Sequence, residues 1–174
     1  MNLRTSQYLQ ISGNIALMLP IHTTGSMVSN LTASNSVHFL TGTAAPCTSL
    51  FKPIWTDMPL PDTGPAPEGK FSDDNLYWQH EKLHRMMLRD LPEHLKQFAS
   101  SRDEFEAEMI STALSASSMD NESRGAMTQQ YFNRSQQLDA QWVNEHTDTK
   151  ADTRPMMFKR RWQQVDRAAV MPDY

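Results

Sequence analysis

The chain has 174 residues, which is enough for one domain with a hydrophobic core and too few for two of ordinary size. Hydrophobic residues make up 39% of it, charged residues 21%, and the formal net charge is -4. This balance excludes a general electrostatic attraction to nucleic acid or to an anionic membrane, so we expect neither as a partner. The single cysteine, Cys47, excludes a disulfide framework and a cysteine-based zinc site.

The N-terminal region contains one short apolar run, residues 15–19, which is closed by Pro20. Its length and continuity predict a buried strand, and it falls far short of the ~20 residues that span a bilayer. The first residues also lack the charged start and the small-residue cleavage site of a signal peptide. We therefore expect a cytoplasmic protein.

Two further apolar runs predict antiparallel strands in the first third of the chain. Residues 26–31 are followed by turn-forming residues and then by residues 36–41, where Val37 and Phe39 share one face. Neither face of this hairpin is cleanly polar, which predicts burial on both faces. Pro53 lies beyond the second strand and predicts that the segment around it is irregular.

Residues 57–74 contain four prolines and two glycines, a composition typical of a loop. This loop separates a strand-rich segment, residues 1–56, from a segment with helical periodicity, residues 75–174. Asp73 or Asp74 is expected to cap the first helix.

Apolar residues at helical spacing predict three to four helices after residue 75, and the fold class is therefore α+β. The inward-facing positions are Leu76, His80, Leu83 and Met87; Leu95, Phe98, Phe105, Met109 and Ala113; Met127, Tyr131, Leu138 and Trp142; and Trp162 and Val165. Pro92 suits the first turn of the second helix. Residues 101–104 fit a capping box, so a new helix could begin there instead.

The first predicted helix carries an H-E-x-x-H motif formed by His80, Glu81 and His84. At this spacing both imidazoles lie on one face, where they can bind zinc, with the glutamate as general base for a metal-bound water. The extended form of the motif fails, because its glycine and third histidine are replaced by Met87 and Asp90. The alternative, which we favour, is that the histidines border the apolar stripe, and we expect no metal.

Cys47 lies in a proline-flanked loop, with His22 and His38 in the same third of the chain. A cysteine–histidine nucleophile pair is one interpretation, since a thiolate at neutral pH needs a nearby cation or helix N-terminus. The other is a small, partly buried cysteine without a chemical role, and we favour it.

Hydroxyl and amino groups gather near the predicted strand ends and are candidates for the wall of a polar pocket: Thr23, Thr24, Thr43 and Lys52. Such residues are also common in any sheet. No glycine-rich phosphate loop accompanies them, so we expect no cofactor.

Four segments, residues 23–29, 37–43, 49–53 and 76–85, follow one another in a characteristic order. In order and spacing they resemble the secernin and bacterial cysteine dipeptidase family, and the last resembles that family's tryptophan-and-HExLHR helix. The resemblance covers about residues 20 to 90. It accounts for the H-E-x-x-H motif without zinc, since members of that family are thiol hydrolases.

The resemblance implies an N-terminal-nucleophile hydrolase, with two stacked antiparallel sheets between helix layers. A cysteine at the mature N-terminus attacks the amide carbonyl of a dipeptide or other short peptide, and its own α-amino group is the base. Here the chain starts at Met1, and Cys47 is internal and cannot be carried over as that nucleophile. Ala44 and Ala45 also replace a frequent Pro-Asp pair.

We therefore expect the C-terminal part of such a dipeptidase, a partial domain that holds no catalytic residue and is inactive alone. Its partners would be a short peptide substrate, an N-terminal half, or a second copy in a homo-oligomer. Two alternatives stay open. One is a non-catalytic binding or assembly module derived from the family, and the other is a zinc hydrolase that uses His80, Glu81 and His84.

Overall fold

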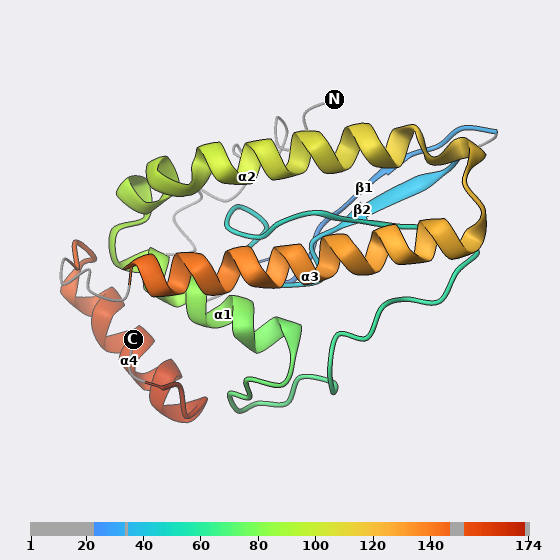
Figure 1. Cartoon of the computed structure of the whole chain (residues 1–174). Coiled ribbons are helices and arrows are strands. Elements are labelled where there is room, and N and C mark those ends of the chain that lie inside the picture. The colour runs from blue at the N-terminus through green and yellow to red at the C-terminus, as the bar shows by residue number, and fades with distance from the viewer. Residues whose placement is uncertain (1–22, 34, 147–151, 173–174) are drawn as a thin grey trace.

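Three short strands and a series of helices make up the computed structural model, which describes residues 23–33, 35–146 and 152–172 (Figure 1). The strands are β1 (Met27–Asn30), β2 (Val37–Leu40) and β3 (Lys52–Ile54), in the antiparallel order β1-β2-β3. The helices follow them in the chain, so the predicted α+β class is confirmed. The strand predicted at residues 15–19 lies outside the described residues.

The β1–β2 hairpin is confirmed, but its burial is one-sided. Val37 and Phe39 are fully buried, whereas His38 and Leu40, which point to the other face, are only half-buried. Met27, opposite Leu40 in the register, is 62% exposed. The prediction of burial on both faces is therefore wrong. The apolar core packs on the face that carries Val37 and Phe39.

Pro53 lies inside a strand and not in an irregular segment, so that prediction is also wrong. It stands opposite Phe39 in the register of β2 and β3. Among the described residues β3 pairs with β2 alone. An edge strand tolerates proline because the side of the strand that faces no neighbour needs no backbone donor.

Four α-helices follow the loop in the described part of the chain: α1 (Leu76–Met87), α2 (Leu91–Leu114), α3 (Asn121–His146) and α4 (Met156–Ala168). A short 3-10 turn, η2 (Leu88–Asp90), joins α1 to α2. A second one, η3 (Ala116–Ser118), lies between α2 and α3. None of the described helices combines the length and the apolarity needed to cross a membrane. The helices span the predicted apolar stripes, and most residues of those stripes lie on the buried helix faces.

Two local signals at the helix ends were misleading. Asn75, and not Asp73 or Asp74, is the N-cap of α1, and its Oδ1 accepts a hydrogen bond of 2.9 Å from the backbone N–H of Trp78. The capping box at residues 101–104 starts no helix, since α2 runs through it without a break. Pro92 does lie in the first turn of α2, as predicted.

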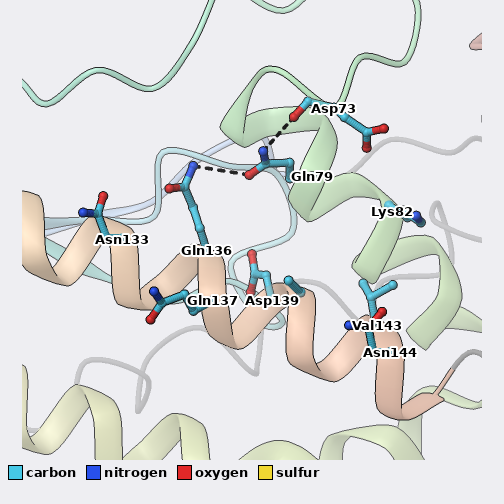
Figure 2. A pocket seen from close by; sticks show the side chains of 10 residues that line it. Asp73, Gln79, Lys82, Asn133, Gln136, Gln137, Asp139, Val143 and Asn144 are labelled. Carbon is cyan, nitrogen blue, oxygen red and sulfur yellow. Dashed lines mark hydrogen bonds between the residues drawn. The ribbon is translucent and has the colours of Figure 1, made fainter.

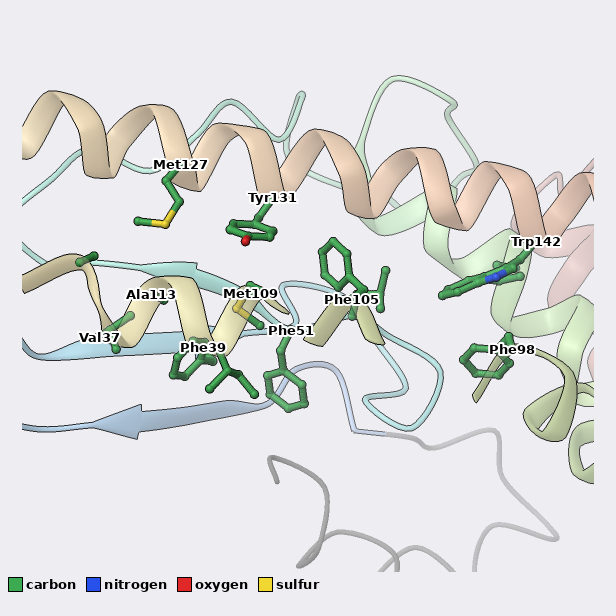
Figure 3. Packing of buried hydrophobic residues seen from close by; sticks show 14 of the residues in the cluster. Val37, Phe39, Phe51, Phe98, Phe105, Met109, Ala113, Met127, Tyr131 and Trp142 are labelled. Carbon is green, nitrogen blue, oxygen red and sulfur yellow. The ribbon is translucent and has the colours of Figure 1, made fainter. Parts of the chain in front are cut away.

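The core is formed by apolar side chains from β2, α1, α2 and α3 and from the residues that flank β3 (Figure 3). The helices are bridged by ring contacts, with centroids 5.7 Å apart for Phe105 and Tyr131 and 4.9 Å apart for Phe98 and Trp142. β3 contacts both α2 and α3. Each large side chain buried in this way stabilises the fold by roughly 1.5–3 kcal/mol relative to an exposed one.

Asn35 joins the hairpin to two other elements. Its Nδ2 donates to the backbone carbonyl of Ala113 at 3.1 Å, near the end of α2. Its Oδ1 accepts from Trp55 Nε1 at 2.9 Å, just beyond β3. A single buried amide therefore fixes the tip of the hairpin against the C-terminal end of α2 and the residue after β3.

α4 packs against α1 through an aromatic and ionic cluster. The guanidinium of Arg85 on α1 lies 5.4 Å from the ring centroid of Trp162 and donates to Asp166 Oδ1 at 2.7 Å. The pKa of Arg85 is raised: burial lowers it, but the carboxylates of Glu81 and Asp166 outweigh that effect. Trp162 is buried and Val165 half-buried, in agreement with their predicted inward orientation.

Gly64 provides a sharp test of the loop that precedes α1. Its φ is +81°, and a Cβ added there would lie 1.9 Å from the backbone oxygen of Asp74. We expect Gly64→Ala to lower the free energy of unfolding by at least about 1–2 kcal/mol, because both the left-handed backbone and the overlap are unfavourable. Urea denaturation followed by circular dichroism measures it. Gly69→Ala is the control, since a Cβ there meets nothing within 4 Å; equal losses for both variants would contradict the loop conformation.

Candidate functional site

A buried chain of hydrogen bonds links the loop after β2 to α1 and α3. His80 lies at its centre, with Nδ1 3.0 Å from Asp139 Oδ2 and Nε2 3.0 Å from Ser49 Oγ. Nε2 is also 3.2 Å from Thr48 Oγ1. All four side chains are buried. The imidazole thus connects a carboxylate on α3 with two hydroxyls from the loop.

The hydroxyl end of this chain is anchored to the loop backbone. Ser49 Oγ lies 2.5 Å from Thr43 Oγ1 and 2.9 Å from the carbonyl oxygen of Ala44. Thr48 Oγ1 donates to the carbonyl oxygen of Ala45 at 3.0 Å. The loop is therefore held closed on itself at the point where it meets His80.

The hydrogen bonds run from Ser49 to His80 and from His80 to Asp139, as in a serine hydrolase triad. In such a triad an imidazole oriented by a carboxylate takes the proton of a hydroxyl nucleophile. Such a serine must reach a substrate carbonyl, however, and Ser49 is completely buried. In this conformation the arrangement satisfies buried polar groups and joins three elements, which is a structural role.

The three residues of the H-E-x-x-H motif lie on α1 as predicted; the two histidines share one hydroxyl, and the glutamate has a different partner. His84 Nδ1 is 3.2 Å from Thr48 Oγ1, the hydroxyl that His80 also contacts. Glu81 Oε2 accepts from Arg85 Nε at 3.0 Å. Within the described residues, no group of three His, Cys, Asp or Glu side chains is arranged to hold a metal.

Lys52 is a buried cation next to this network. Nζ donates to the backbone carbonyl of Leu50 at 2.8 Å and lies 5.6 Å from the ring centroid of Phe132. Burial lowers its pKa to about 8, and the nearby carboxylates of Asp139 and Glu106 offset only part of that effect. Glu106 is itself fixed by the backbone N–H of Phe51, which donates to it at 3.2 Å.

The four candidate wall residues do not come together. Thr43 and Lys52 are buried in the polar interior, whereas Thr23 and Thr24 are exposed. The backbone oxygen of Thr23 helps to hold the loop, because it accepts a hydrogen bond from the N–H of Ala45 at 2.8 Å.

The proposed cysteine–histidine pair is only partly described. Cys47 is half-buried in the loop. His38 lies on the half-buried face of the sheet, with Nδ1 2.8 Å from Ser29 Oγ. His22 lies outside the described residues.

A cavity of about 570 Å³ lies between α1 and α3 (Figure 2). α1 contributes Gln79 and Lys82, and α3 contributes Asp139 and four carboxamide side chains, Asn133, Gln136, Gln137 and Asn144. The Nε2 of Gln136 donates to Gln79 Oε1 across the helix pair at 3.3 Å. The volume of the cavity lies within the range of about 300–1,000 Å³ found for small-molecule sites.

Sequence reasoning missed both Asp139 and this cavity. The available signal was an acidic residue at an inward position of α3, on the stripe that also carries Tyr131 and Trp142. A carboxylate there requires a buried partner. The partner is His80, 59 positions away, and nothing in the local sequence indicates which residue it is.

Comparisons with known proteins found no matching family model, no matching curated protein and no matching solved structure. Function is therefore inferred from the contacts of this chain and from the sequence resemblance described above.

Proposed function

We propose that the chain is the C-terminal portion of a secernin-like cysteine dipeptidase with an N-terminal-nucleophile hydrolase fold. The observation that supports this most is the contact between Ser49 and His80. These residues come from two separate segments of the resemblance, residues 49–53 and 76–85. A third segment, residues 37–43, contributes Thr43, which lies 2.5 Å from Ser49 Oγ.

Polar residues from three resembling segments therefore form one buried cluster. Short motifs that arise by chance are not expected to bring their polar residues together in the interior of a fold. Buried polar groups have to be satisfied together, so a change in one member leaves its partners unpaired. The convergence of these residues favours a scaffold inherited as a unit. In this proposal the cluster supports the sheet, and the nucleophilic cysteine is supplied by another portion of the enzyme.

The half-buried face of the sheet is consistent with an incomplete sandwich. Met27 is 62% and Leu31 72% exposed, and within the described residues β1 pairs only with β2. An unpaired strand edge is a template for further strands. An N-terminal half, or a second copy of the chain in a homo-oligomer, would supply them.

A zinc hydrolase fits the contacts less well. Both ring nitrogens of His80 are engaged, one by Asp139 and the other by Ser49 and Thr48. A carboxylate on the far nitrogen of a zinc-bound histidine is common, but the metal would have to displace the two hydroxyls. Glu81, the required general base, is bound to Arg85.

The test is reconstitution. The chain is mixed with a separately purified N-terminal portion that begins with cysteine, and dipeptide cleavage is measured by release of free amino acids. We expect cleavage only from the mixture, and none when the leading cysteine is replaced by serine. Cys47→Ser in this chain is the matched control and should leave the activity unchanged. Cleavage by this chain alone, or an active mixture that depends on Cys47, would contradict the proposal.

A further inference from the structure

The carboxylate of Asp139 is only half satisfied. Oδ2 binds His80 Nδ1 at 3.0 Å, but Oδ1 has no hydrogen-bond partner among the described residues. The side chain is 10% exposed and lines the α1–α3 cavity (Figure 2). A buried carboxylate oxygen without a donor is unfavourable. A donor that enters the cavity would remove that cost, and an ammonium group is the strongest such donor.

The opposite charge lies on the facing helix. Lys82, on α1, lines the same cavity, is half-buried, and forms no ion pair with any carboxylate in the described ranges. Its ammonium can bind an anion in the cavity. A ligand with a positive charge alone would be repelled by Lys82, and one with a negative charge alone by Asp139.

The remaining polar lining consists of the exposed carboxylate of Asp73 and four neutral carboxamides. Asn133, Gln136, Gln137 and Asn144 each offer both a donor and an acceptor. Carboxamides of this kind bind a polar ligand without adding net charge. The two carboxylates, the ammonium and the carboxamides together complement a small molecule that carries both charges and a polar neutral group.

We propose that the α1–α3 cavity binds a small zwitterion of the amino-acid type, whose ammonium contacts the carboxylate of Asp139 and whose carboxylate contacts Lys82. This inference does not depend on the proposed peptidase function, because it rests on the cavity and its charges alone. The ligand completes the hydrogen bonding of Asp139 and thereby stabilises the pair with His80.

The experiment is isothermal titration calorimetry on the full chain with L-glutamine, whose side-chain carboxamide matches the lining. N-acetyl-L-glutamine removes the ammonium, and L-glutaminamide removes the carboxylate. We expect each of these to bind about tenfold more weakly than glutamine, since each loses a charge-assisted hydrogen bond. Equal binding of the acetylated compound, or no binding of glutamine, would overturn the proposal.

Variants of residues that line the cavity test whether glutamine binds there. Asp139→Asn and Lys82→Gln should weaken glutamine binding about tenfold, whereas Lys96→Gln, on the exposed surface of α2, should leave it unchanged. Asp139 also holds His80, so a loss of binding in its variant could reflect disorder. Ala140→Leu fills the cavity from an exposed position on α3 and touches no member of the hydrogen-bond network. It should abolish binding with an unchanged thermal unfolding midpoint, and retained binding would place the ligand elsewhere.

Discussion

His80→Ala is expected to lower the free energy of unfolding by about 3 kcal/mol or more, because it leaves several buried polar groups unsatisfied at about 1–3 kcal/mol each. The loss would leave the carboxylate of Asp139 and the hydroxyl of Ser49 without their central partner in the protein interior. Guanidinium denaturation of both proteins, followed by circular dichroism, measures the difference.

His38→Ala is the matched control for that variant. His38 is half-buried and, among the described residues, makes one side-chain hydrogen bond, to Ser29, so its replacement should cost about 1 kcal/mol. A double-mutant cycle with Asp139→Ala isolates the coupling between His80 and its carboxylate. If His80→Ala and His38→Ala have the same effect, or if the cycle gives no coupling, the buried network does not stabilise the fold.

The stability of the chain should rise with pH on the alkaline side, and Lys52 is the reason. Burial lowers the pKa of Lys52 to about 8 in the folded protein, against an ordinary value of 10.5. Below pH 8 both the folded and unfolded states hold the proton, and the cost of the buried charge is present in full. Between about pH 8 and 10.5 the folded state has released the proton while the unfolded state still binds it, so the free energy of unfolding increases. The total gain is about 3 kcal/mol.

The pH series is measured by urea denaturation from pH 7 to 11, for the wild type and for Lys52→Met. Other lysines and the tyrosines titrate in both proteins, so the informative quantity is the difference between the two curves. The wild type should gain about 3 kcal/mol relative to the variant across this window. Lys96→Met, on the exposed surface of α2, should give a curve parallel to that of the wild type. Parallel curves for Lys52→Met would mean that Lys52 titrates at its ordinary value.

The helical part of the fold could be predicted from the sequence because its information is local. Leu83, Met109 and Trp142 each belong to an apolar stripe with helical spacing on their own helix, and each faces the core. Helix ends were harder, since Asp73, Asp74 and Asn75 are all good N-cap residues and only the backbone conformation selects Asn75. The strand through Pro53 was missed because a proline is acceptable only where a strand lies at an edge, which depends on tertiary structure.

The sequence predicted the positions of single residues of the candidate site but not which of them contact one another. The motif placed His80 and His84 on one face of a helix, which is a local property. Their actual partners include Thr48, Ser49 and Asp139, which lie 31 or more positions away in the sequence. Hydroxyls near strand ends indicated a polar region, but chain pattern does not distinguish the buried Thr43 from the exposed Thr24.

The amide of Asn35 also determines how the strands can align. A slip of β2 by one residue would turn Phe39 outward and His38 into the core. It would also carry Asn35 away from the carbonyl of Ala113 and from Trp55 Nε1, two contacts that lie on different elements. Both hydrogen bonds need Asn35 at its present position, so a shifted pairing of the strands would break them. The hairpin, although its strands have four residues each, therefore has a single alignment.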